Sequence, residues 1–245
     1  MFAMVYLAML YLGLISGIIV GNYFAKMAGL DSARIFIATV LLTIPFLVGA
    51  RLLFVAINWK LYRREPTRIW RRSEGGASFQ GGLVLALIVA PPLLAAMKVP
   101  FAPFLDVTTF ALLITLIFGR VGCTLHGCCC GRPTEGWFAL YLPNHLGVWR
   151  RRIPSQLLEL ALAVLILVGA WCGWNHRPFS GAVFLASLSV YALGRFVLQP
   201  TREANERLGA VDAQRALAAA LGLLALAAFL FNWLNTGMNA TPEVQ

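Results

Sequence analysis

Seven unbroken apolar runs, each long enough to cross a lipid bilayer, constrain this sequence more than any other feature. They cover residues 2–24, 35–59, 79–97, 101–125, 155–174, 179–199 and 211–233. A helix of about 20 apolar residues spans the hydrocarbon layer of about 30 Å. A membrane β-barrel would show short segments of alternating polarity instead of continuous runs. The pattern predicts an all-α integral membrane protein with seven transmembrane helices in one domain, residues 1–245.

The composition agrees with a membrane protein, because 60% of the residues are hydrophobic and only 12% are charged. The formal net charge is +10. The basic residues lie in short loops beside the apolar runs, so anionic lipid headgroups are the expected partner and nucleic acid is not. The first run has no cationic segment before it and no clear cleavage site after it. It is therefore expected to be a retained helix rather than a removed signal peptide.

Lys and Arg residues are distributed unequally between the two sets of loops. The loops joining runs two to three, four to five and six to seven carry twelve, whereas the opposite loops carry four. Because cytoplasmic loops carry the excess of basic residues, the count places the first set in the cytoplasm. Lys26 and Arg34, which follow the first run, favour the opposite orientation.

Residues 126–154 form the longest polar segment and contain the turn signals RPTEG and PNHLG. Its length of 29 residues exceeds that of a simple connection, so we expect a small head over the helix bundle. The tail, residues 235–245, is expected to be frayed. No internal repeat or low-complexity segment is found.

Three arginines lie within apolar runs, namely Arg51, Arg120 and Arg195. An arginine at the bilayer centre costs about 2.5 to 3.5 kcal/mol, and such a residue normally faces the bundle interior and marks a site. Near a helix end it could instead extend its guanidinium to the interface. Arg195 and Gln199 share a helical face, which favours a joint polar role. Converging guanidiniums suit a phosphate, so the pattern predicts a pocket for a phospholipid headgroup.

Two carboxylates leave a structural alternative open. Asp106 and Glu159 also lie in apolar runs and could neutralise these arginines in purely structural ion pairs. Glu159 follows Ser155 by one helical turn.

Residues 119–131, GRVGCTLHGCCCG, concentrate sulfur at the end of the fourth run. The cluster consists of Cys123, His126, Cys128, Cys129 and Cys130. Zinc sites usually show C-x2-C pairs, which this spacing does not match, so no metal and no cofactor are predicted. Adjacent cysteines form at best a strained disulfide, and disulfides persist mainly outside the cytosol. A nearby arginine and histidine could produce a reactive thiolate, or the cysteines could simply pack.

A lone cysteine and a glycine-rich segment are two further features of the sequence. Cys172, alone near the end of the fifth run, is expected in the core. In EGGASFQGG, residues 74–82, two glycine pairs bracket Phe79 and Gln80. Glycine allows a close approach of backbone to backbone or to a ligand. Gln80, Gly81 and Gly82 are therefore candidates either for close helix packing or for ligand contact.

Four segments resemble, in the same order, the motifs of the bacterial prolipoprotein diacylglyceryl transferase family. GRVGCTLHGCCCG is similar to the family's GR-x-GN signature with its glycine-rich turn, and EGGASFQGG to its DGG-x-SFHGG segment. IPSQLLEL is similar to HPSQLYEL, and YALGRFVLQPTRE to a run with a helix arginine before an acidic and basic turn. The resemblance covers residues 49–214 and the same seven helices.

The resemblance implies that the diacylglyceryl group of phosphatidylglycerol moves to a cysteine thiol in a preprolipoprotein signal peptide, releasing glycerol phosphate, at the bacterial inner membrane. Arg120 and Arg195 match arginines that hold the lipid phosphate. Gly131 matches the closing glycine and Arg51 an arginine of the second helix. A last set lies in or beside the same motifs and is expected to bind substrate: Gln80, Gly81, Gly82, Gln199 and Arg202.

The sequence departs from the family pattern at three site positions. Gln80 stands where the family has the histidine proposed as base, Cys123 replaces an asparagine and Cys128 replaces a glutamate. Glutamine accepts no proton near neutral pH, so His126 or a thiolate is the expected base. The family's working loops lie on the outer face, opposite to the orientation that the charge count predicts.

These observations predict a phospholipid-dependent transferase that moves a diacylglyceryl group to a thiol-bearing protein or small molecule. Arg120 and Arg195 would stabilise the departing glycerol phosphate. The nucleophile would be the acceptor thiol, or Cys123 or Cys128 as a covalent carrier. The alternative is a non-catalytic or thiol-based lipid-binding protein with a cytoplasm-facing cysteine cluster, which Gln80 and Cys128 favour. A channel is not favoured, since no ring of polar positions recurs.

Overall fold

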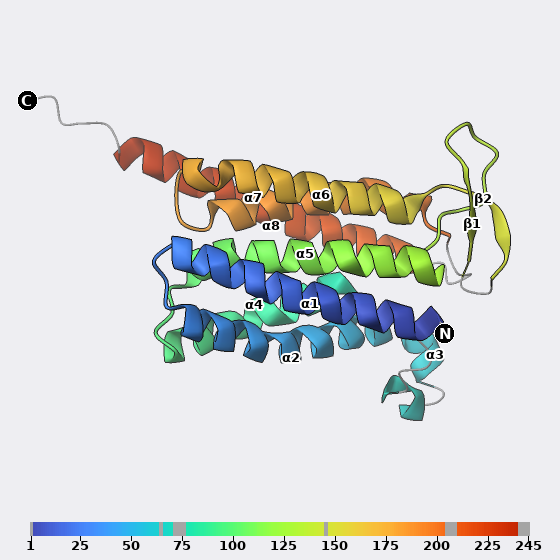
Figure 1. The fold of residues 1–245 in the computed structure, drawn as a ribbon, viewed down its shortest axis with the longest axis horizontal. Coiled ribbons are helices and arrows are strands. Elements are labelled where there is room, and N and C mark those ends of the chain that lie inside the picture. Colours follow the sequence, from blue (N-terminus) through green and yellow to red (C-terminus); the bar gives the residue numbers. More distant parts are fainter. Residues whose placement is uncertain (1, 64–65, 71–76, 145–146, 204–209, 240–245) are drawn as a thin grey trace, which may run out of the picture.

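In the described part of the chain, seven long helices form the body of the protein (Figure 1). The computed structural model describes residues 2–63, 66–70, 77–144, 147–203 and 210–239. The long helices are α1 (Phe2–Met27), α2 (Ser32–Ile57), α4 (Phe79–Ala96), α5 (Phe101–His126), α6 (Ser155–Gly173), α7 (Ala182–Leu198) and α8 (Ala210–Asn239). Short helical turns are α3 (Trp59–Tyr62), η1 (Pro66–Trp70), η3 (Trp174–His176) and η4 (Gln199–Thr201). All seven long helices have the length and hydropathy of a membrane span, as the sequence predicts.

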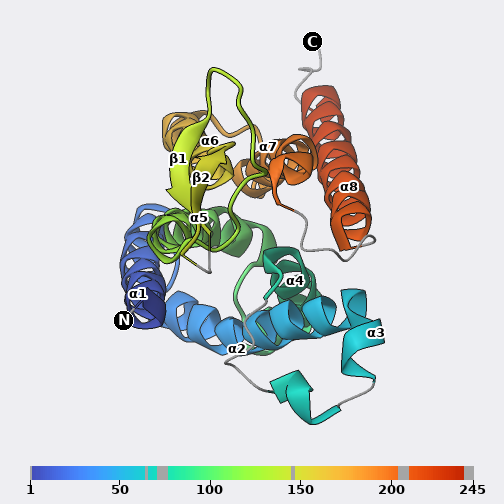
Figure 2. The same ribbon diagram turned by 90° about the vertical axis from the view of Figure 1, so that its right-hand side faces the viewer.

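The helices run roughly along one axis and pack mainly in pairs. Helix α1 lies along α5, α2 along α4, and α7 along α8, while α6 packs on α5 (Figures 1 and 2). Phe24 stacks on Phe110 with ring centroids 3.6 Å apart, and Trp174 meets both rings edge-on. These rings pin α1, α5 and the end of α6 together in the buried core.

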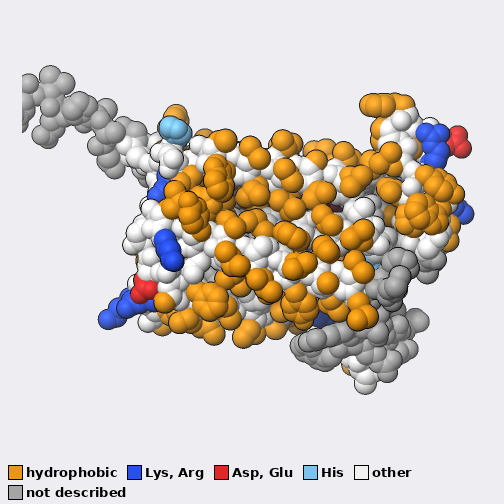
Figure 3. All heavy atoms as spheres, in the orientation of Figure 1, with side chains coloured by type: hydrophobic (Ala, Val, Ile, Leu, Met, Phe, Trp, Pro, Cys, Tyr) orange, Lys and Arg blue, Asp and Glu red, His pale blue; other side chains and the backbone are white. Residues whose placement is uncertain are grey.

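The outer surface of the bundle is apolar. In the view of Figure 3, hydrophobic side chains cover the middle of the molecule, and Lys and Arg side chains gather at its two ends. Large exposed side chains on different helices contribute, among them Ile44, Ile88, Leu165 and Leu223. In water such a surface would be unstable, whereas lipid tails cover it without cost. The chain is a multi-pass membrane protein.

A β-hairpin lies between α5 and α6, at the end of the bundle where the chain begins (Figure 1). Strand β1 (Leu140–Pro143) pairs antiparallel with β2 (Trp149–Arg152), and Leu140 lies opposite Arg152. Gly131 forms an isolated bridge with Arg202. The hairpin segment is thus tied to the turn after α7, and this end of the bundle is called the head end below.

Helix α8 extends further than the sequence indicated. Its last residue is Asn239, so residues 235–239 continue the helix. That this tail frays stays a prediction. Residues 240–245 lie outside the described residues.

Glycines let α2 and α4 approach closely. A Cβ on Gly81 would lie 2.5 Å from the carbonyl oxygen of Gly49, and one on Gly82 would lie 2.7 Å from that of Phe46. Distances below 3.0 Å are not tolerated between such atoms. Gly81 and Gly82 therefore serve close helix packing. The first glycine pair, Gly75 and Gly76, lies outside the described residues.

Asp106 caps a helix and does not neutralise the site arginines. Its buried carboxylate accepts hydrogen bonds from the backbone N–H of Gly181 at 2.7 Å and of Phe184 at 3.1 Å. These are N–H groups at the start of α7, which have no partner within the helix. The suggestion that Asp106 pairs with Arg120 or Arg195 is therefore wrong, because helix packing places it at the N-terminus of α7.

Asp106→Ala should destabilise the protein strongly. It leaves two buried N–H groups unpaired, at about 1–3 kcal/mol each. We expect a clear drop in the thermal unfolding midpoint of the detergent-solubilised protein. Asp31→Ala is the matched control, since Asp31 caps α2 at an exposed end, where a cap is worth about 1 kcal/mol. Equal midpoints for the two variants would contradict this role of Asp106.

Candidate active site at the head end of the bundle

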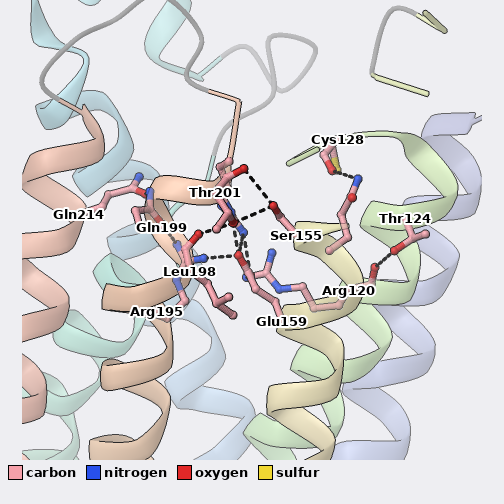
Figure 4. Close-up of polar contacts among 12 residues, drawn as sticks. Arg120, Thr124, Cys128, Ser155, Glu159, Arg195, Leu198, Gln199, Thr201 and Gln214 are labelled. Atoms are coloured by element: carbon pink, nitrogen blue, oxygen red, sulfur yellow. Dashed lines mark hydrogen bonds and ion pairs between the residues drawn. The ribbon is translucent and has the colours of Figure 1, made fainter. Parts of the chain in front are cut away.

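One buried carboxylate, Glu159 on α6, collects three guanidinium groups (Figure 4). Arg120 Nη2 lies 2.7 Å from Glu159 Oε2, and Arg195 Nη1 lies 2.6 Å from Oε1. Arg202 binds with two atoms, since Nε and Nη2 each lie 2.8 Å from one carboxylate oxygen. Residues of α5, of α7 and of the segment after η4 thus converge on α6. We call these four residues the Glu159 cluster.

The local sequence explains this convergence. Glu159 lies one turn after the start of α6, so its side chain stays at the head end. Ser155 Oγ contacts Thr201 Oγ1 at 2.8 Å, which fixes the start of α6 against η4. Arg202 directly follows η4 and is thereby brought beside Glu159. Of the two carboxylates that the sequence left open as partners for the arginines, Glu159 is the one that pairs with them.

The Glu159 cluster carries excess positive charge. Its three guanidiniums and one carboxylate sum to +2, and Arg120, Arg195 and Glu159 are all buried. Buried charge is costly unless it is paired. Among the described residues, the Arg120 guanidinium forms one ion pair, through Nη2, so Nη1 and Nε remain as donors. The cluster is therefore suited to an added anion.

A chain of glutamines extends the cluster to α8 and α4. Arg195 Nη2 donates to Gln199 Oε1 at 2.5 Å, and Gln199 Nε2 donates to Gln214 Oε1 at 2.7 Å. Gln80 Nε2 donates to the Gln214 carbonyl oxygen at 3.3 Å. Gln80 and Gln199, both predicted from sequence, are thus joined through Gln214, which the sequence did not single out.

Residues 123–130, which we call the cysteine turn, cover the end of α5 and the turn after it and lie beside the Glu159 cluster. The chain leaves the helix at Gly127, with φ 74°, and Cys129 also has a positive φ of 57°. Gln156 Nε2 donates to the Cys128 carbonyl oxygen at 3.0 Å, which ties the turn to α6. The Sγ atoms of Cys123, Cys128 and Cys129 lie within 4.8 Å of one another. All are free thiols.

Cys130 takes part in a different contact. Its Sγ lies 3.1 Å from Glu203 Oε2, and the same oxygen binds Arg152 Nη1 at 2.6 Å. Arg152 is 1% exposed, so this ion pair anchors strand β2 to the segment after η4. Cys130 therefore belongs with Arg152 and Glu203, which we call the head anchor, and not with the three neighbouring thiols of Cys123, Cys128 and Cys129.

The comparisons with known proteins agree with this arrangement. The family model described as prolipoprotein diacylglyceryl transferase matches residues 3–233, nearly the whole chain. The chain belongs to the prolipoprotein diacylglyceryl transferase family. A Geobacter sulfurreducens protein named phosphatidylglycerol–prolipoprotein diacylglyceryl transferase is 31% identical over 206 residues, which are 82% of this chain and 78% of that protein.

Two further relatives with that enzyme name are more distant. The Symbiobacterium thermophilum protein is 28% identical over 224 residues, 86% of this chain and 82% of the relative. A second such transferase of Clostridium perfringens is 25% identical over 189 residues, 75% of this chain and 72% of the relative. The resemblance inferred from four motifs is thus confirmed over most of the chain.

The remaining predicted residues take diverse places in this family member. Arg51 Nε donates to the Ile69 carbonyl oxygen at 2.8 Å, and its guanidinium lies over the rings of Phe54 and Tyr62. His126 is half-buried against Tyr6, with ring centroids 6.1 Å apart. Its Nδ1 is buried and has no hydrogen-bond partner among the described residues.

Some residues were missed or misjudged from sequence. Cys172 is exposed on α6, so its expected core position is wrong: its side of the helix faces outward. Gln156 was not singled out, although it donates to the Cys128 carbonyl oxygen, and Cys129 was named only as a member of the cysteine cluster and not as a catalytic candidate. Gln156 and Glu159 are three residues apart and share a helical face, which is the one signal that could have revealed Gln156.

The cysteines of the turn should differ in reactivity. Hydrogen bonds with Cys123 and Cys128, and the charges of Arg202 and Arg120, lower the pKa of Cys129 well below its usual value. Hydrogen bonds to Cys123 and Cys129 raise the pKa of Cys128. Burial and the bond to Glu203 raise the pKa of Cys130 to about 11.

Cys129 should therefore be alkylated first. The lowered pKa gives Cys129 a larger thiolate fraction than Cys128 or Cys130 at any given pH, and Cys130 stays protonated until the pH approaches its raised pKa. Iodoacetamide treatment of chelator-treated protein, followed by peptide mass spectrometry, measures the order. Cys130 labelled as fast as Cys129 at neutral pH would show that these charges and bonds do not set reactivity.

Gly131→Ala should disrupt the packing of the segment after α5 against the start of α6. A Cβ there would lie 2.0 Å from the Ile153 carbonyl oxygen and 2.6 Å from Ser155 Oγ. The backbone must shift, which loosens the start of α6 and the cluster, so we expect lower stability and lower activity. Gly136→Ala in the same segment has no contact below 3.4 Å and should behave as wild type. Thermal unfolding of both variants tests the difference.

Proposed function

We propose that this protein transfers the diacylglyceryl group of phosphatidylglycerol to a thiol and releases glycerol phosphate. The proposal rests on the Glu159 cluster, a buried site of charge +2 near the membrane-water boundary. A phosphodiester carries one negative charge and suits guanidinium donors. The named relatives act on phosphatidylglycerol and prolipoprotein, which supports this lipid as donor and a lipoprotein cysteine as acceptor.

Arg120 is the proposed primary contact to the phosphate. It is the guanidinium of the cluster with the most unused donors, and Glu159 fixes its position. Tyr191 lies one turn before Arg195 on α7, and its buried hydroxyl has no partner among the described residues. It is a further proposed donor to the lipid phosphate. Glu159 is a positioning residue, because it acts through the arginines.

In the proposed reaction, the acceptor thiol loses its proton to solvent, and its sulfur attacks the glyceryl carbon that carries the phosphate. A carbon-sulfur bond forms, the bond from that carbon to the phosphate oxygen breaks, and the electron pair leaves on that oxygen. The leaving phosphate gains a second negative charge, which the excess positive charge of the cluster stabilises more than it stabilises the diester. Such preorganised charge is the usual large catalytic term.

We further propose the bacterial inner membrane as the location. The seven spans and the bacterial relatives support a membrane that contains phosphatidylglycerol. The orientation predicted from the basic loops stays a prediction. Cysteine substitution at an exposed residue of the segment before β1, such as Trp137, and labelling with a membrane-impermeant thiol reagent would determine the side of the head.

A transfer assay with the purified protein tests the function. The protein in detergent is mixed with phosphatidylglycerol and a signal-like peptide that contains one cysteine. We expect glycerol phosphate release and a peptide whose mass has increased by a diacylglyceryl group, and no change in a peptide with serine instead. A lipid adduct on Cys123 or Cys128 without peptide modification would instead indicate a thiol-based carrier. If neither the modified peptide nor the lipid adduct forms, transferase activity is contradicted and the lipid-binding alternative is favoured.

A further inference from the structure

The three thiols of the cysteine turn are spaced for a common metal ion. The Sγ atoms of Cys123, Cys128 and Cys129 all lie within 4.8 Å of one another. Three thiolates bound to one zinc ion at about 2.3 Å, with tetrahedral angles, stand about 3.8 Å apart. Small side-chain rotations thus suffice to bring all three sulfurs onto one ion.

We propose that Cys123, Cys128 and Cys129 bind one thiophilic divalent cation, zinc in the first instance, and leave one coordination position for the acceptor thiol. The metal site stands on the geometry of the trio. The role of the open position rests on the proposed function.

The folded cysteine turn brings the three thiols together although their spacing in the sequence does not match a zinc motif. A zinc site usually shows cysteines two residues apart, and this chain has one cysteine on a helix and three in a row. Cys123 lies in the last turn of α5, and the backbone reverses through Gly127 and Cys129, both with positive φ. Because of this reversal, Cys128 and Cys129 both approach Cys123 from the other side.

The trio has the form of a site with an open position. Zinc sites that only stabilise a fold have four protein ligands, whereas sites that bind a reactant have three. Among the described residues, no fourth His, Cys, Asp or Glu joins the group. Cys130 is directed to Glu203 instead. Cys123 is buried and Cys129 is exposed, so the trio extends from the core to the surface.

The charge of the surroundings suits a metal bound by three thiolates. Three thiolates and a divalent cation sum to −1. Arg120 and Arg202 act electrostatically on Cys129, so the excess positive charge of the Glu159 cluster lies beside the trio. The same arginines would thus balance the metal site on one side and the lipid phosphate on the other.

Such an ion would deprotonate the acceptor thiol without a protein base, which this chain lacks at position 80. A thiol that coordinates a metal loses its proton outright, here to solvent. Its sulfur then attacks the glyceryl carbon as described above, and the electron pair leaves on the phosphate oxygen. The thioether product is a weak ligand and departs. No histidine is needed at position 80, where Gln80 accepts no proton.

Cobalt binding tests the site without reference to activity. Reduced, chelator-treated full-length protein in detergent is titrated with Co²⁺ and its absorption recorded. We expect one ion per chain, sulfur-to-cobalt charge-transfer bands and displacement by Zn²⁺. Cys128→Ser and Cys129→Ser should weaken binding by at least the roughly 10- to 100-fold that even an outer partner of a metal ligand contributes.

Two cysteine variants serve as matched controls. Cys130→Ser changes the third cysteine of the same CCC run, whose thiol contacts Glu203 and not the other two cysteines. Cys172→Ser changes an exposed thiol on α6. Both should bind cobalt as wild type does. The metal site is overturned if the wild type shows no charge-transfer band, or if the band is equally strong in Cys128→Ser and Cys129→Ser.

The acceptor role has its own readout. Adding the cysteine peptide should shift the cobalt bands, and the serine peptide should not; the absence of a shift would overturn the open position. Equal transfer with and without chelator, and no cobalt band, would overturn the inference while the proposed function stands. Cobalt bound by the trio without any peptide lipidation would support the metal site and contradict the proposed function.

Discussion

Glu159→Gln is expected to abolish transfer and to destabilise the protein more than any other single change in the site. It removes the one carboxylate that holds three guanidiniums, and Arg120, Arg195 and Glu159 itself are buried. Breaking a buried ion pair by removing one partner costs about 3–5 kcal/mol. The arginines then repel one another and lose the geometry that would bind a phosphate. Thermal unfolding and the transfer assay measure both effects.

Two variants make the Glu159 result specific. Glu159→Asp keeps the charge and should retain part of the stability and activity. Glu135→Gln removes an exposed carboxylate of the head segment and should change neither. If Glu159→Gln unfolded at the wild-type temperature and kept full activity, the carboxylate would have no positioning role.

Arg120→Ala is expected to lower kcat by about 10² to 10³, the usual loss when one donor to a developing negative charge is removed. Arg195 and Arg202 still hold Glu159 in this variant, so the fold should survive. The loss should appear mainly in kcat, since the charge on the phosphate grows only during the reaction. Single-turnover rates with phosphatidylglycerol separate this loss from weaker binding.

Arg34→Ala is the control for Arg120→Ala. Arg34 forms an exposed pair with Asp31 on α2, which is worth about 0–1 kcal/mol. Its removal should leave transfer unchanged. A lipid-binding protein without chemistry would behave differently: Arg120→Ala would lower lipid affinity, and neither variant would alter a turnover rate. That outcome would contradict the proposed function.

The seven spans were predictable because a helix that crosses the hydrocarbon layer needs about 20 consecutive apolar residues, and this pattern is distinct from that of soluble helices and strands. The arginines at 120 and 195 were predictable for the same reason, since charge in such a run must be compensated. Their partner was not. Asp106 and Glu159 are both single carboxylates in apolar runs, and one caps α7 while the other binds three arginines.

The cysteine turn shows the same limit. Sequence spacing disfavoured a metal site, yet the structure brings Cys123, Cys128 and Cys129 within 4.8 Å. Spacing rules assume a regular backbone, and a chain that reverses through two positive φ values does not follow them. Gln214 was invisible for a different reason: its role depends on α8 packing against the end of α7.

The sequence by itself determined that the chain spans a membrane seven times and carries arginines inside it, because transfer free energies act residue by residue. Four ordered motifs also placed it in its family. Only the tertiary structure decided which carboxylate meets the arginines, that their sum is +2 and which thiols face one another. These properties depend on distances between helices far apart in the chain, and hydrophobic periodicity carries no information about such distances.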